Sequence, residues 1–460
     1  MKKSIIIFSI LLVTIGTGCK KWVDGYRVSP NSPAKNTPSL LLSVSELAVF
    51  SAYNGQLART ASIFTQQSAG TDFQMQDVAL YSIDESANLN EWKSIYADGL
   101  INMQELIELS GDDNPRYRGI GRVLKSMTIG LCTDYWGDVP YSEALKGLDG
   151  NDFYNPNYDK QEEIIKNIQS ELDLAIEDLQ SADEENKLLP STDDFIHGGD
   201  AAAWIKTAYI IKLRYANRLS KKDGSGSAQT VLDIYNASGL ASGDDAFAVY
   251  GLNGNELNLW SAFNQIRANY IKMGGYFVDL LKATNDPRLT IYCSVDDSGG
   301  YSGTPNNSFE TTTSNLGSLY GGDDSPLPLA LYSEALFIKA EAHWRLGQNA
   351  EAATALNDAV KESILRTTGA SDSTYEATYA NETAGSITQD KIMTQKYVDL
   401  FTQPEVWADW RRTGLPALTP NPDAQLTEIP RRLITPVDER IYNTNAIIVS
   451  DMLQKVWWDQ

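Results

Sequence analysis

Apolar residues recur at helical spacing along most of this chain, and the clearest example is the stretch 332–364. Small residues follow the same spacing on both sides of Gly347, at positions 335, 342, 352 and 359, and no proline interrupts them. Small side chains at this spacing let two helices approach closely across a tight turn. Because one helical hairpin cannot bury its own apolar face, we expect partner hairpins elsewhere in the chain.

The hairpin at 332–364 is about 34 residues long and resembles a tetratricopeptide repeat, although an ordinary hairpin of another all-α protein would share its pattern. Further apolar stripes predict helices at 41–67, 92–107, 118–136, 164–179, 204–219 and 393–401. Asp159 with Glu162, and Ser386 with Gln389, are spaced as capping boxes for two of them. The pattern therefore predicts a mainly α protein with a scaffold of tetratricopeptide-like helix pairs.

The region between Gly239 and Pro326 departs from this pattern. It holds twelve of the 33 glycines, together with tyrosines, a tryptophan and aspartate pairs, which indicates irregular backbone. Within it, residues 273–292 keep a helical apolar face. A second irregular stretch runs from Thr65 to Leu89. Loops on a rigid helical frame are where binding sites usually lie, so we expect the ligand site there.

The first residues are typical of an export signal. Lys2 and Lys3 precede a short apolar run, and Gly16, Thr17 and Gly18 lead to a cysteine. We predict a signal peptide at 1–18, lipidation of Cys19 and a tether at 19–38. A plain secretory signal with an incidental cysteine is the alternative. The apolar run of the signal is too short to span a bilayer as a resting helix, and the sequence contains no second long apolar run.

The acidic composition narrows the possible partners. The formal charge is −22, and removal of Lys2 and Lys3 makes it −24, which argues against binding nucleic acid or anionic lipid headgroups. Two cysteines, Cys132 and Cys293, follow Cys19, which is too few for a disulfide framework, and their pairing stays open.

Enzyme chemistry finds little support in the sequence. It contains two histidines and neither a G-x-S-x-G elbow nor a phosphate-binding glycine loop, so we expect no catalytic site and no cofactor. The pairs at 244–245, 296–297 and 323–324 are aspartates, but their spacing matches no calcium loop. We therefore interpret them as solvated turns and predict no metal site.

Residues 122–145 resemble a hallmark of the SusD/RagB family of nutrient-binding outer-membrane lipoproteins. The core of this segment is Asp134, Tyr135, Gly137, Asp138, Pro140, Tyr141 and Ala144. Further family-like segments follow in the expected order, at 204–220, 286–289, 332–364, 395–416 and 429–443. Together they cover nearly the whole chain after the signal.

The resemblance implies a single SusD-like domain that binds an oligosaccharide, or another nutrient, at the cell surface. Such a protein passes its ligand to a SusC-type TonB-dependent transporter and performs no chemistry on it. On this basis the domain spans 39–460, with a helical scaffold at about 39–238 and 326–460 and a loop-rich ligand-binding lobe at about 239–325. The alternatives are a scaffold lipoprotein without its own ligand site and a surface glycoside hydrolase.

Sugar binding requires flat aromatic rings for the C–H face of the sugar and amides for its hydroxyl groups. We therefore select the aromatic and amide residues of the irregular regions as ligand-binding candidates. They are Phe73, Gln74, Tyr81, Trp260, Asn264, Tyr301, Asn307 and Tyr320. The tryptophans at 92, 136, 204, 344, 407 and 410 lie on helical stripes or family motifs, and we expect them in the core.

Two arginine pairs, 411–412 and 431–432, are conspicuous in an acidic chain. They could clamp an anionic substrate. We favour a structural role in which they join the C-terminal segments to carboxylates of the helical frame.

Overall fold

The computed structural model describes residues 36–147 and 149–460, except the side chain of Asp152. The predicted signal peptide, the lipidation site Cys19 and residues 19–35 of the predicted tether lie outside the described residues. The helices of the N-terminal half are α3 (Pro38–Asn54), α4 (Gln56–Phe64), α5 (Phe73–Ala79), α6 (Leu89–Lys93), α7 (Ile101–Ser110), α8 (Pro115–Trp136), α9 (Gln161–Leu179), α10 (Ala201–Arg218) and α11 (Gly224–Ser238). Those of the C-terminal half are α12 (Leu259–Ile266), α13 (Gly275–Ala283), α14 (Leu289–Tyr292), α15 (Ser318–Gly321), α16 (Tyr332–Arg345), α17 (Asn349–Thr368), α18 (Ser373–Tyr379), α19 (Gln389–Asp399), α20 (Glu405–Thr413) and α21 (Val437–Tyr442).

Short elements complete the chain. A π-helical turn, η2 (Ser94–Leu100), joins α6 to α7, and 3-10 turns occur at η3 (Asn151–Phe153), η4 (Asp183–Glu185), η5 (Leu219–Lys221) and η6 (Trp457–Asp459). The strands are β1 (Ser68–Gly70), β2 (Val139–Pro140), β3 (Tyr158–Asp159), β4 (Ala246–Ala248), β5 (Ile271–Met273) and β6 (Leu327–Ala330). The described chain is therefore mainly α, as the sequence predicts.

Antiparallel helix pairs form the scaffold. In the pair α8/α9, Arg118 near the start of α8 binds Asp178 near the end of α9 at 2.7 Å. Arg122, one turn further along α8, binds Glu171 at 2.6 Å. In the pair α10/α11, Lys206 near the start of α10 donates to the carbonyl oxygen of Ser238 at the end of α11 at 2.9 Å. These contacts join opposite ends of the two sequences, so each pair runs antiparallel.

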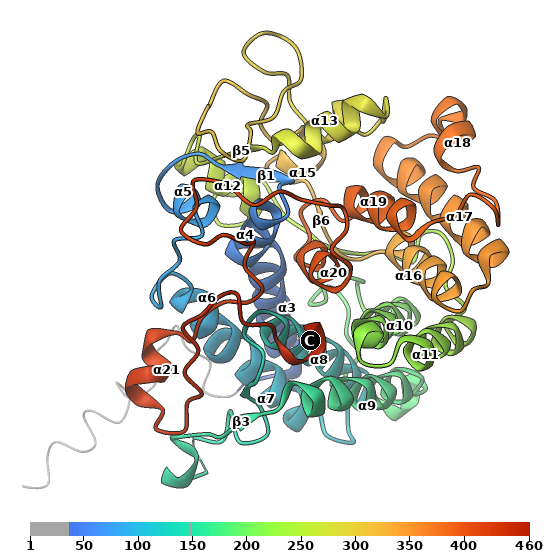
Figure 1. Cartoon of the computed structure of the whole chain (residues 1–460). Coiled ribbons are helices and arrows are strands. Elements are labelled where there is room, and N and C mark those ends of the chain that lie inside the picture. The colour runs from blue at the N-terminus through green and yellow to red at the C-terminus, as the bar shows by residue number, and fades with distance from the viewer. Residues whose placement is uncertain (1–35, 148) are drawn as a thin grey trace, which may run out of the picture.

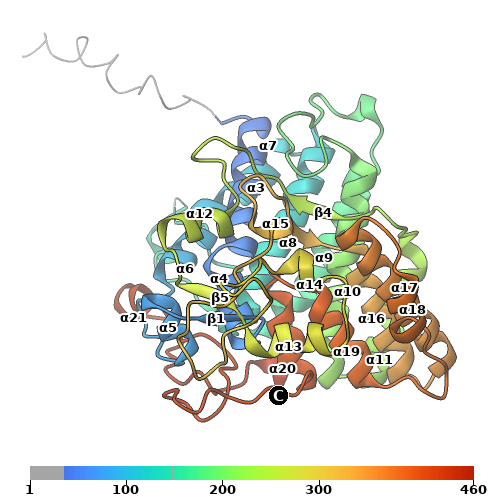
Figure 2. The ribbon, with the colours of Figure 1, turned by 90° about the horizontal axis from the view of Figure 1, so that it is seen from above.

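The predicted tetratricopeptide-like unit is the pair α16/α17. Its helices meet at Gly347, whose φ of 72° is a left-handed conformation that glycine adopts without strain. Helix α9 packs against α10, and α11 packs against α16, so the pairs follow one another across the molecule (Figure 1). Seen from above, α16, α17 and α18 lie on one side, and α5, α6 and α12 lie on the other (Figure 2). The predicted helix-pair scaffold is confirmed.

Three local predictions are wrong. The stripe at 41–67 is two helices, because the chain turns at Gly55, where an added Cβ would lie 2.3 Å from the Ser51 carbonyl oxygen. Asp159 does not cap α9; its carboxylate accepts from the backbone N–H groups of residues 141 and 142 at 2.9 and 2.8 Å. Helix α19 is capped by Thr388, whose hydroxyl accepts from the Lys391 N–H at 3.3 Å, and not by Ser386.

Two-stranded antiparallel sheets join the loop-rich lobe at about 239–325 to other parts of the chain. Strand β4 pairs with β6, and β1 pairs with β5 with Ala69 opposite Lys272. The second pairing brings the irregular stretch 65–89 into the same lobe as the glycine-rich region (Figures 1 and 2). The apolar face predicted at 273–292 is divided, because Met273 ends β5 and only residues 275–283 and 289–292 are helical.

The core of the described residues contains five of the six tryptophans that the sequence places there. Trp92, Trp136, Trp204 and Trp407 are buried, Trp410 is nearly so, and Trp344 is half-buried against a second apolar cluster around α17.

The arginine pairs are structural, but only two of the four arginines bind carboxylates. Arg412 binds Glu341 of α16 at 2.6 Å, and Arg431 binds Asp459 at 2.5 Å. Arg411 donates to the backbone carbonyl oxygens of Asp134 and Arg431 at 2.7 and 2.9 Å. Arg432 donates to carbonyl oxygens as well. The expected carboxylate contacts therefore hold for one member of each pair.

Among the described residues, none of the helices combines the length and apolarity that a bilayer crossing requires.

Candidate functional site

The short helix α5 and the chain on either side of it carry unusual backbone strain. Gln66, Phe73 and Tyr81 have positive φ angles of 59°, 41° and 53°, and Asn269, next to β5, has 67°. For residues with a Cβ atom this conformation is costly and persists only where the surroundings impose it. Such residues are frequent at binding sites, so the strain points to this part of the lobe.

Phe73 presents a ring to solvent at the start of α5. Its exposed fraction is 65%, and its ring stacks on that of Tyr270 with centroids 5.1 Å apart and planes 20° from parallel. The carboxylate of Asp72 accepts from the Phe73 N–H at 2.9 Å, which fixes the helix start. A supported ring with an exposed side is suited to stacking on the C–H face of a sugar.

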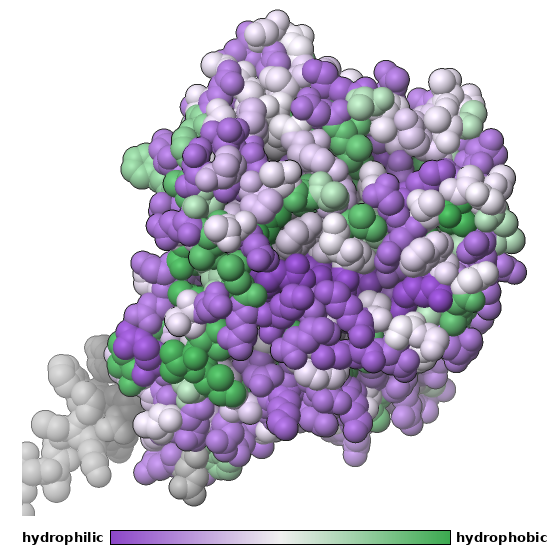
Figure 3. All heavy atoms as spheres, in the orientation of Figure 1, coloured by the Kyte–Doolittle hydropathy of each residue, from purple (hydrophilic) through white to green (hydrophobic). Residues whose placement is uncertain are grey.

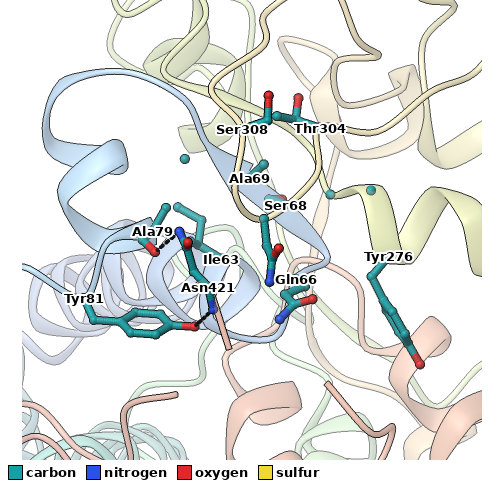
Figure 4. Close-up of a pocket in the computed structure, with 14 residues that line it drawn as sticks. Ile63, Gln66, Ser68, Ala69, Ala79, Tyr81, Tyr276, Thr304, Ser308 and Asn421 are labelled. Carbon is teal, nitrogen blue, oxygen red and sulfur yellow. Dashed lines mark hydrogen bonds between the residues drawn. The ribbon is translucent and has the colours of Figure 1, made fainter. Parts of the chain in front are cut away.

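A first recess, which we call the tyrosine recess, is a small hollow beside the β1/β5 sheet with room for about one water molecule (Figure 4). Its lining residues are Ile63, Gln66, Ser68, Ala69, Gly70, Ala79, Tyr81, Gly274, Gly275, Tyr276, Thr304, Asn306, Ser308 and Asn421. The Tyr81 hydroxyl accepts from the Asn421 N–H at 3.3 Å, and Asn421 Nδ2 donates to the Ala79 carbonyl oxygen at 2.9 Å. Tyr81 and Tyr276 lie on opposite sides of the recess.

The polar side chains of the tyrosine recess are held in place by the backbone of a C-terminal segment. Gln66 and Asn306 both donate to the carbonyl oxygen of Thr419, at 2.6 and 2.8 Å. Burial raises the pKa values of Tyr81 and Tyr276, so both phenols are neutral at pH 7 and can donate or accept hydrogen bonds. Amides and phenols of this kind suit the hydroxyl groups of a sugar.

A second recess, which we call the arginine recess, lies between α4, α5, α6 and α12 and encloses about 1100 Å³ including its mouth. Its lining residues are Gln56, Arg59, Gln74, Asp77, Val78, Ser82, Ile83, Asp84, Ser86, Ala87, Asn88, Asn90, Glu91, Phe263 and Arg267. Gln74 joins this recess to Phe73, its neighbour in the chain. The rings continue the link, because Tyr270, which stacks under Phe73, also meets Phe263 edge-on at 6.1 Å.

The structure brings three of the predicted ligand residues together at α5 and just after it: Phe73, Gln74 and Tyr81. Tyr81 lines the tyrosine recess but is only 4% exposed, so most of its ring belongs to the core. Asn264 is half-buried on α12, and Tyr301 is half-buried with its carbonyl oxygen accepting from Lys282 at 3.1 Å. Asn307 is exposed, between two residues that line the tyrosine recess. No ligand contact is tested for any of them, so their binding role stays a prediction.

Trp260 and Tyr320 require a correction, because both are core residues. Trp260 is 1% exposed on α12, and Tyr320 is 2% exposed, stacks on Tyr292 at 5.7 Å and accepts from Arg366 at 2.7 Å. Neither ring has a face left to offer to a ligand. Aromatic residues of a loop-rich lobe also have to build the core of that lobe, and the sequence pattern alone does not separate the two roles.

The sequence reasoning missed Gln66, Tyr276 and Asn421 in the tyrosine recess and Arg59 and Arg267 in the arginine recess. A usable signal existed for Tyr276, which follows two glycines. An added Cβ at Gly274 would lie 2.1 Å from the Gln66 carbonyl oxygen, so this glycine marks a close approach of two chain segments. Asn421 is 340 residues from Tyr81, and nothing in the sequence joins them.

Within 36–147 and 149–460, no group of three or more histidine, cysteine and carboxylate side chains is arranged to hold a metal ion. Cys132 and Cys293 are buried free thiols, and burial raises the pKa of each above its usual value. They are therefore neither a disulfide nor reactive thiolates at pH 7.

The surface also carries an apolar patch beside α21, which is green in Figure 3. Ile441, Tyr442, Ile447 and Ile448 contribute to it, with exposed fractions of 56%, 72%, 45% and 51%. Exposed apolar patches of this kind commonly mark contacts with other macromolecules.

Residues 30–436 match the protein family described as starch-binding associating with outer membrane, the SusD-like proteins. The chain belongs to the SusD-like family. No curated protein sequence matches it. The family resemblance drawn from the sequence is therefore confirmed, and SusD-like proteins are generally binding proteins rather than enzymes.

Solved structures of proteins with low sequence identity to this chain share its fold. A chitin-binding protein is 23% identical, with a TM-score of 0.79, and the match covers 92% of this chain and 100% of that one. A chitin-binding SusD homologue from Flavobacterium johnsoniae is 19% identical, with a TM-score of 0.77 and 91% and 98% covered. A SusD/RagB family protein from Bacteroides thetaiotaomicron is 23% identical, with a TM-score of 0.74 and 92% and 99% covered.

Proposed function

We propose that this SusD-like protein is a lipid-anchored cell-surface protein that binds an oligosaccharide and passes it to a SusC-type TonB-dependent transporter. The observation that carries the proposal is the exposed ring of Phe73, supported by Tyr270 and next in the chain to Gln74, which lines the arginine recess. A stacking ring beside amide and phenol groups is a common way to hold a sugar without reacting with it. Family membership supports the same function.

The positive φ of Phe73 supports a binding role for its ring. The conformation costs stability, yet the exposed ring returns little of that cost through burial. A ligand that stacks on the ring would explain why the strained backbone geometry is kept. The chitin-binding proteins with this fold make chitin oligosaccharides reasonable first probes.

Phe73→Ala should weaken retention of the bound glycan about tenfold while leaving the melting temperature nearly unchanged, since the ring contributes little to the core. Affinity gels cast with a panel of polysaccharides, together with thermal unfolding, measure both effects. Phe195→Ala is the matched control, because Phe195 is also an exposed phenylalanine, 38% exposed, in the segment that precedes α10.

Equal retention by the wild type, Phe73→Ala and Phe195→Ala would remove Phe73 from the site. Incubation of the wild type with the retained glycan should release no new reducing ends, whereas a glycoside hydrolase would release them. A purely scaffolding role would require only binding to a SusC-type transporter. Co-purification of that transporter from outer membranes, with a variant that no longer binds glycan, separates the capture role from the scaffolding role.

A further inference from the structure

The arginine recess contains two cations without a counter-charge at contact distance. Arg59 is 8% exposed, its Nη1 donates to the Leu259 carbonyl oxygen at 3.3 Å, and its Nε has no partner among the described residues. Within residues 36–147 and 149–460, neither Arg59 nor Arg267 takes part in an ion pair. A buried guanidinium without a charged partner is costly, so this arrangement calls for an explanation.

Other buried arginines of this chain have charged or backbone partners, although Arg411 Nη2 and Arg412 Nε, like Arg59 Nε, have no partner among the described residues. Arg412 binds the carboxylate of Glu341 at 2.6 Å, and Arg411 donates to backbone carbonyl oxygens deep in the core. Arg59 and Arg267 instead share an open recess at the surface of the ligand lobe. Their position suggests that the missing partner comes from outside the chain.

One aromatic ring packs against both guanidinium groups. The ring centroid of Phe263 lies 4.3 Å from Cζ of Arg59 and 5.3 Å from Cζ of Arg267. The pKa of Arg59 is lowered to about 10, chiefly by burial and also by the charge of Arg267, while the charge of Glu91 opposes the shift. Arg59 therefore remains charged at pH 7, and an anion bound in the recess would offset the repulsion between the two arginines.

The carboxylates of the recess do not neutralise these cations by contact. The carboxylate of Asp84 accepts from the N–H and hydroxyl of Ser86 at 2.8 and 2.6 Å, so its hydrogen bonds go to the local turn and not to the arginines. Burial raises the pKa of Glu91, and its Oε2 has no partner among the described residues. Asp77 also lines the recess, on α5, and forms no ion pair within the described chain. The carboxylates therefore leave both arginines without an ion pair, and Arg267, which is half-buried at the recess, is the arginine that a ligand can reach more easily.

We propose that the arginine recess binds the anionic group, a carboxylate or a sulfate ester, of an acidic saccharide whose sugar ring stacks on Phe73. The inference rests on the proposed function and specifies its substrate class. Guanidinium groups match both anions, because their planar donors can form paired hydrogen bonds. Gln74 and the contact series Phe73–Tyr270–Phe263 connect the stacking ring to the cations.

Matched polymers test this proposal on the full-length protein. Polygalacturonate and its methyl-esterified form differ in free carboxylates, and dextran sulfate and dextran differ in sulfate esters. We expect the wild type to prefer one acidic polymer over its neutral counterpart by at least about tenfold in affinity gels. Binding should weaken when NaCl is raised from about 50 to about 500 mM. The pair of polymers in which the acidic form binds more tightly shows whether the anion is a carboxylate or a sulfate ester.

Arg267→Gln should remove most of this preference, and Arg267→Lys should restore part of it, because the charge returns without the paired donors. The control is Arg116→Gln, which removes a positive charge at the start of α8, where Arg116 pairs with the exposed Asp183 at 2.6 Å. Melting temperatures report whether each variant is folded. The buried Arg59→Gln provides a second variant of the same recess.

Equal binding of the acidic and neutral polymers would overturn the proposal, as would equal effects of Arg267→Gln and Arg116→Gln. If a neutral polymer binds through Phe73 with no acidic preference, the proposed function stands and only the anionic substrate class is lost. If no polymer is retained, both the proposed function and this inference are overturned.

Discussion

At the scale of single residues, Glu46 is the most unusual ionisable group of the scaffold. It lies fully buried on α3, where one carboxyl oxygen accepts from the Phe195 N–H at 2.7 Å and the other has no partner among the described residues. Burial and, to a smaller extent, the nearby charge of Asp194 raise the pKa of Glu46 to about 10. Glu46 is therefore protonated in the folded protein at pH 7 and ionised in the unfolded chain.

The raised pKa predicts how stability depends on pH. The contribution of Glu46 is fully present below pH 4.5, its ordinary pKa, and is lost as pH rises towards 10. Glu46→Gln should raise the free energy of unfolding at pH 7 by at most about 3 kcal/mol, because folding no longer requires proton uptake. Urea unfolding of both proteins between pH 5 and pH 9 measures the effect. The prediction would be contradicted if the difference in free energy of unfolding between the two proteins did not increase with pH.

Residue-scale reasoning from the sequence succeeded with residue type and failed with exposure. Phe73, Gln74 and Tyr81 were selected as aromatic or amide residues of an irregular stretch, and they do surround α5. Trp260 met the same criteria and is buried, and Tyr81, although it lines the tyrosine recess, is buried as well. Exposure depends on which segments pack over a ring, and those segments are far away in the chain.

At the scale of elements, the contact of α8 with α10 depends on one glycine. An added Cβ at Gly130 would lie 2.0 Å from the Tyr215 hydroxyl oxygen, which itself approaches Asp134 at 3.5 Å. Glycine therefore lets the buried tyrosine pass directly over the backbone of α8.

Gly130→Ala should lower the free energy of unfolding by about 1–3 kcal/mol, because the added methyl group forces the two helices or the tyrosine to shift. Gly224→Ala is the control, since no atom lies within 4 Å of the position of its added Cβ at the start of α11. Chemical denaturation distinguishes the two. Equal stabilities would mean that the tyrosine moves aside freely.

Elements with a strong helical period were predictable, and elements set by distant contacts were not. The α16/α17 hairpin follows from the spacing of its alanines and from Gly347, all of which are local signals. Strands β1 and β5 have three residues each and pair across 200 positions, so no local period reveals them. The tyrosine recess depends on this pairing, which explains why most of its polar residues were missed.

At the scale of the whole molecule, a buried charge network joins the C-terminal helices to the tetratricopeptide-like pair. Arg412 of α20 binds Glu341 of α16 at 2.6 Å and Asp409 at 2.8 Å, and Lys396 of α19 binds Asp409 at 2.6 Å. All four side chains are buried. Charges placed in this way are stable only as a complete set.

Arg412→Ala should lower the free energy of unfolding by about 3–5 kcal/mol, because Glu341 would remain buried without its partner. Arg440→Ala, which breaks an exposed pair with Glu85, is the control and should leave the unfolding transition almost in place. Thermal unfolding followed by circular dichroism measures both variants. A small effect of Arg412→Ala would show that water or a rearranged lysine replaces the arginine.

The pairing of β1 with β5 also sets an order of events during synthesis. The first strand ends at Gly70, but its partner starts only at Ile271, after the helices from α5 to α12 have been made. A nascent chain can therefore stack its early hairpins long before it has any surface for a sugar. A truncation that stops short of residue 271 would yield helices without the capacity to capture a nutrient.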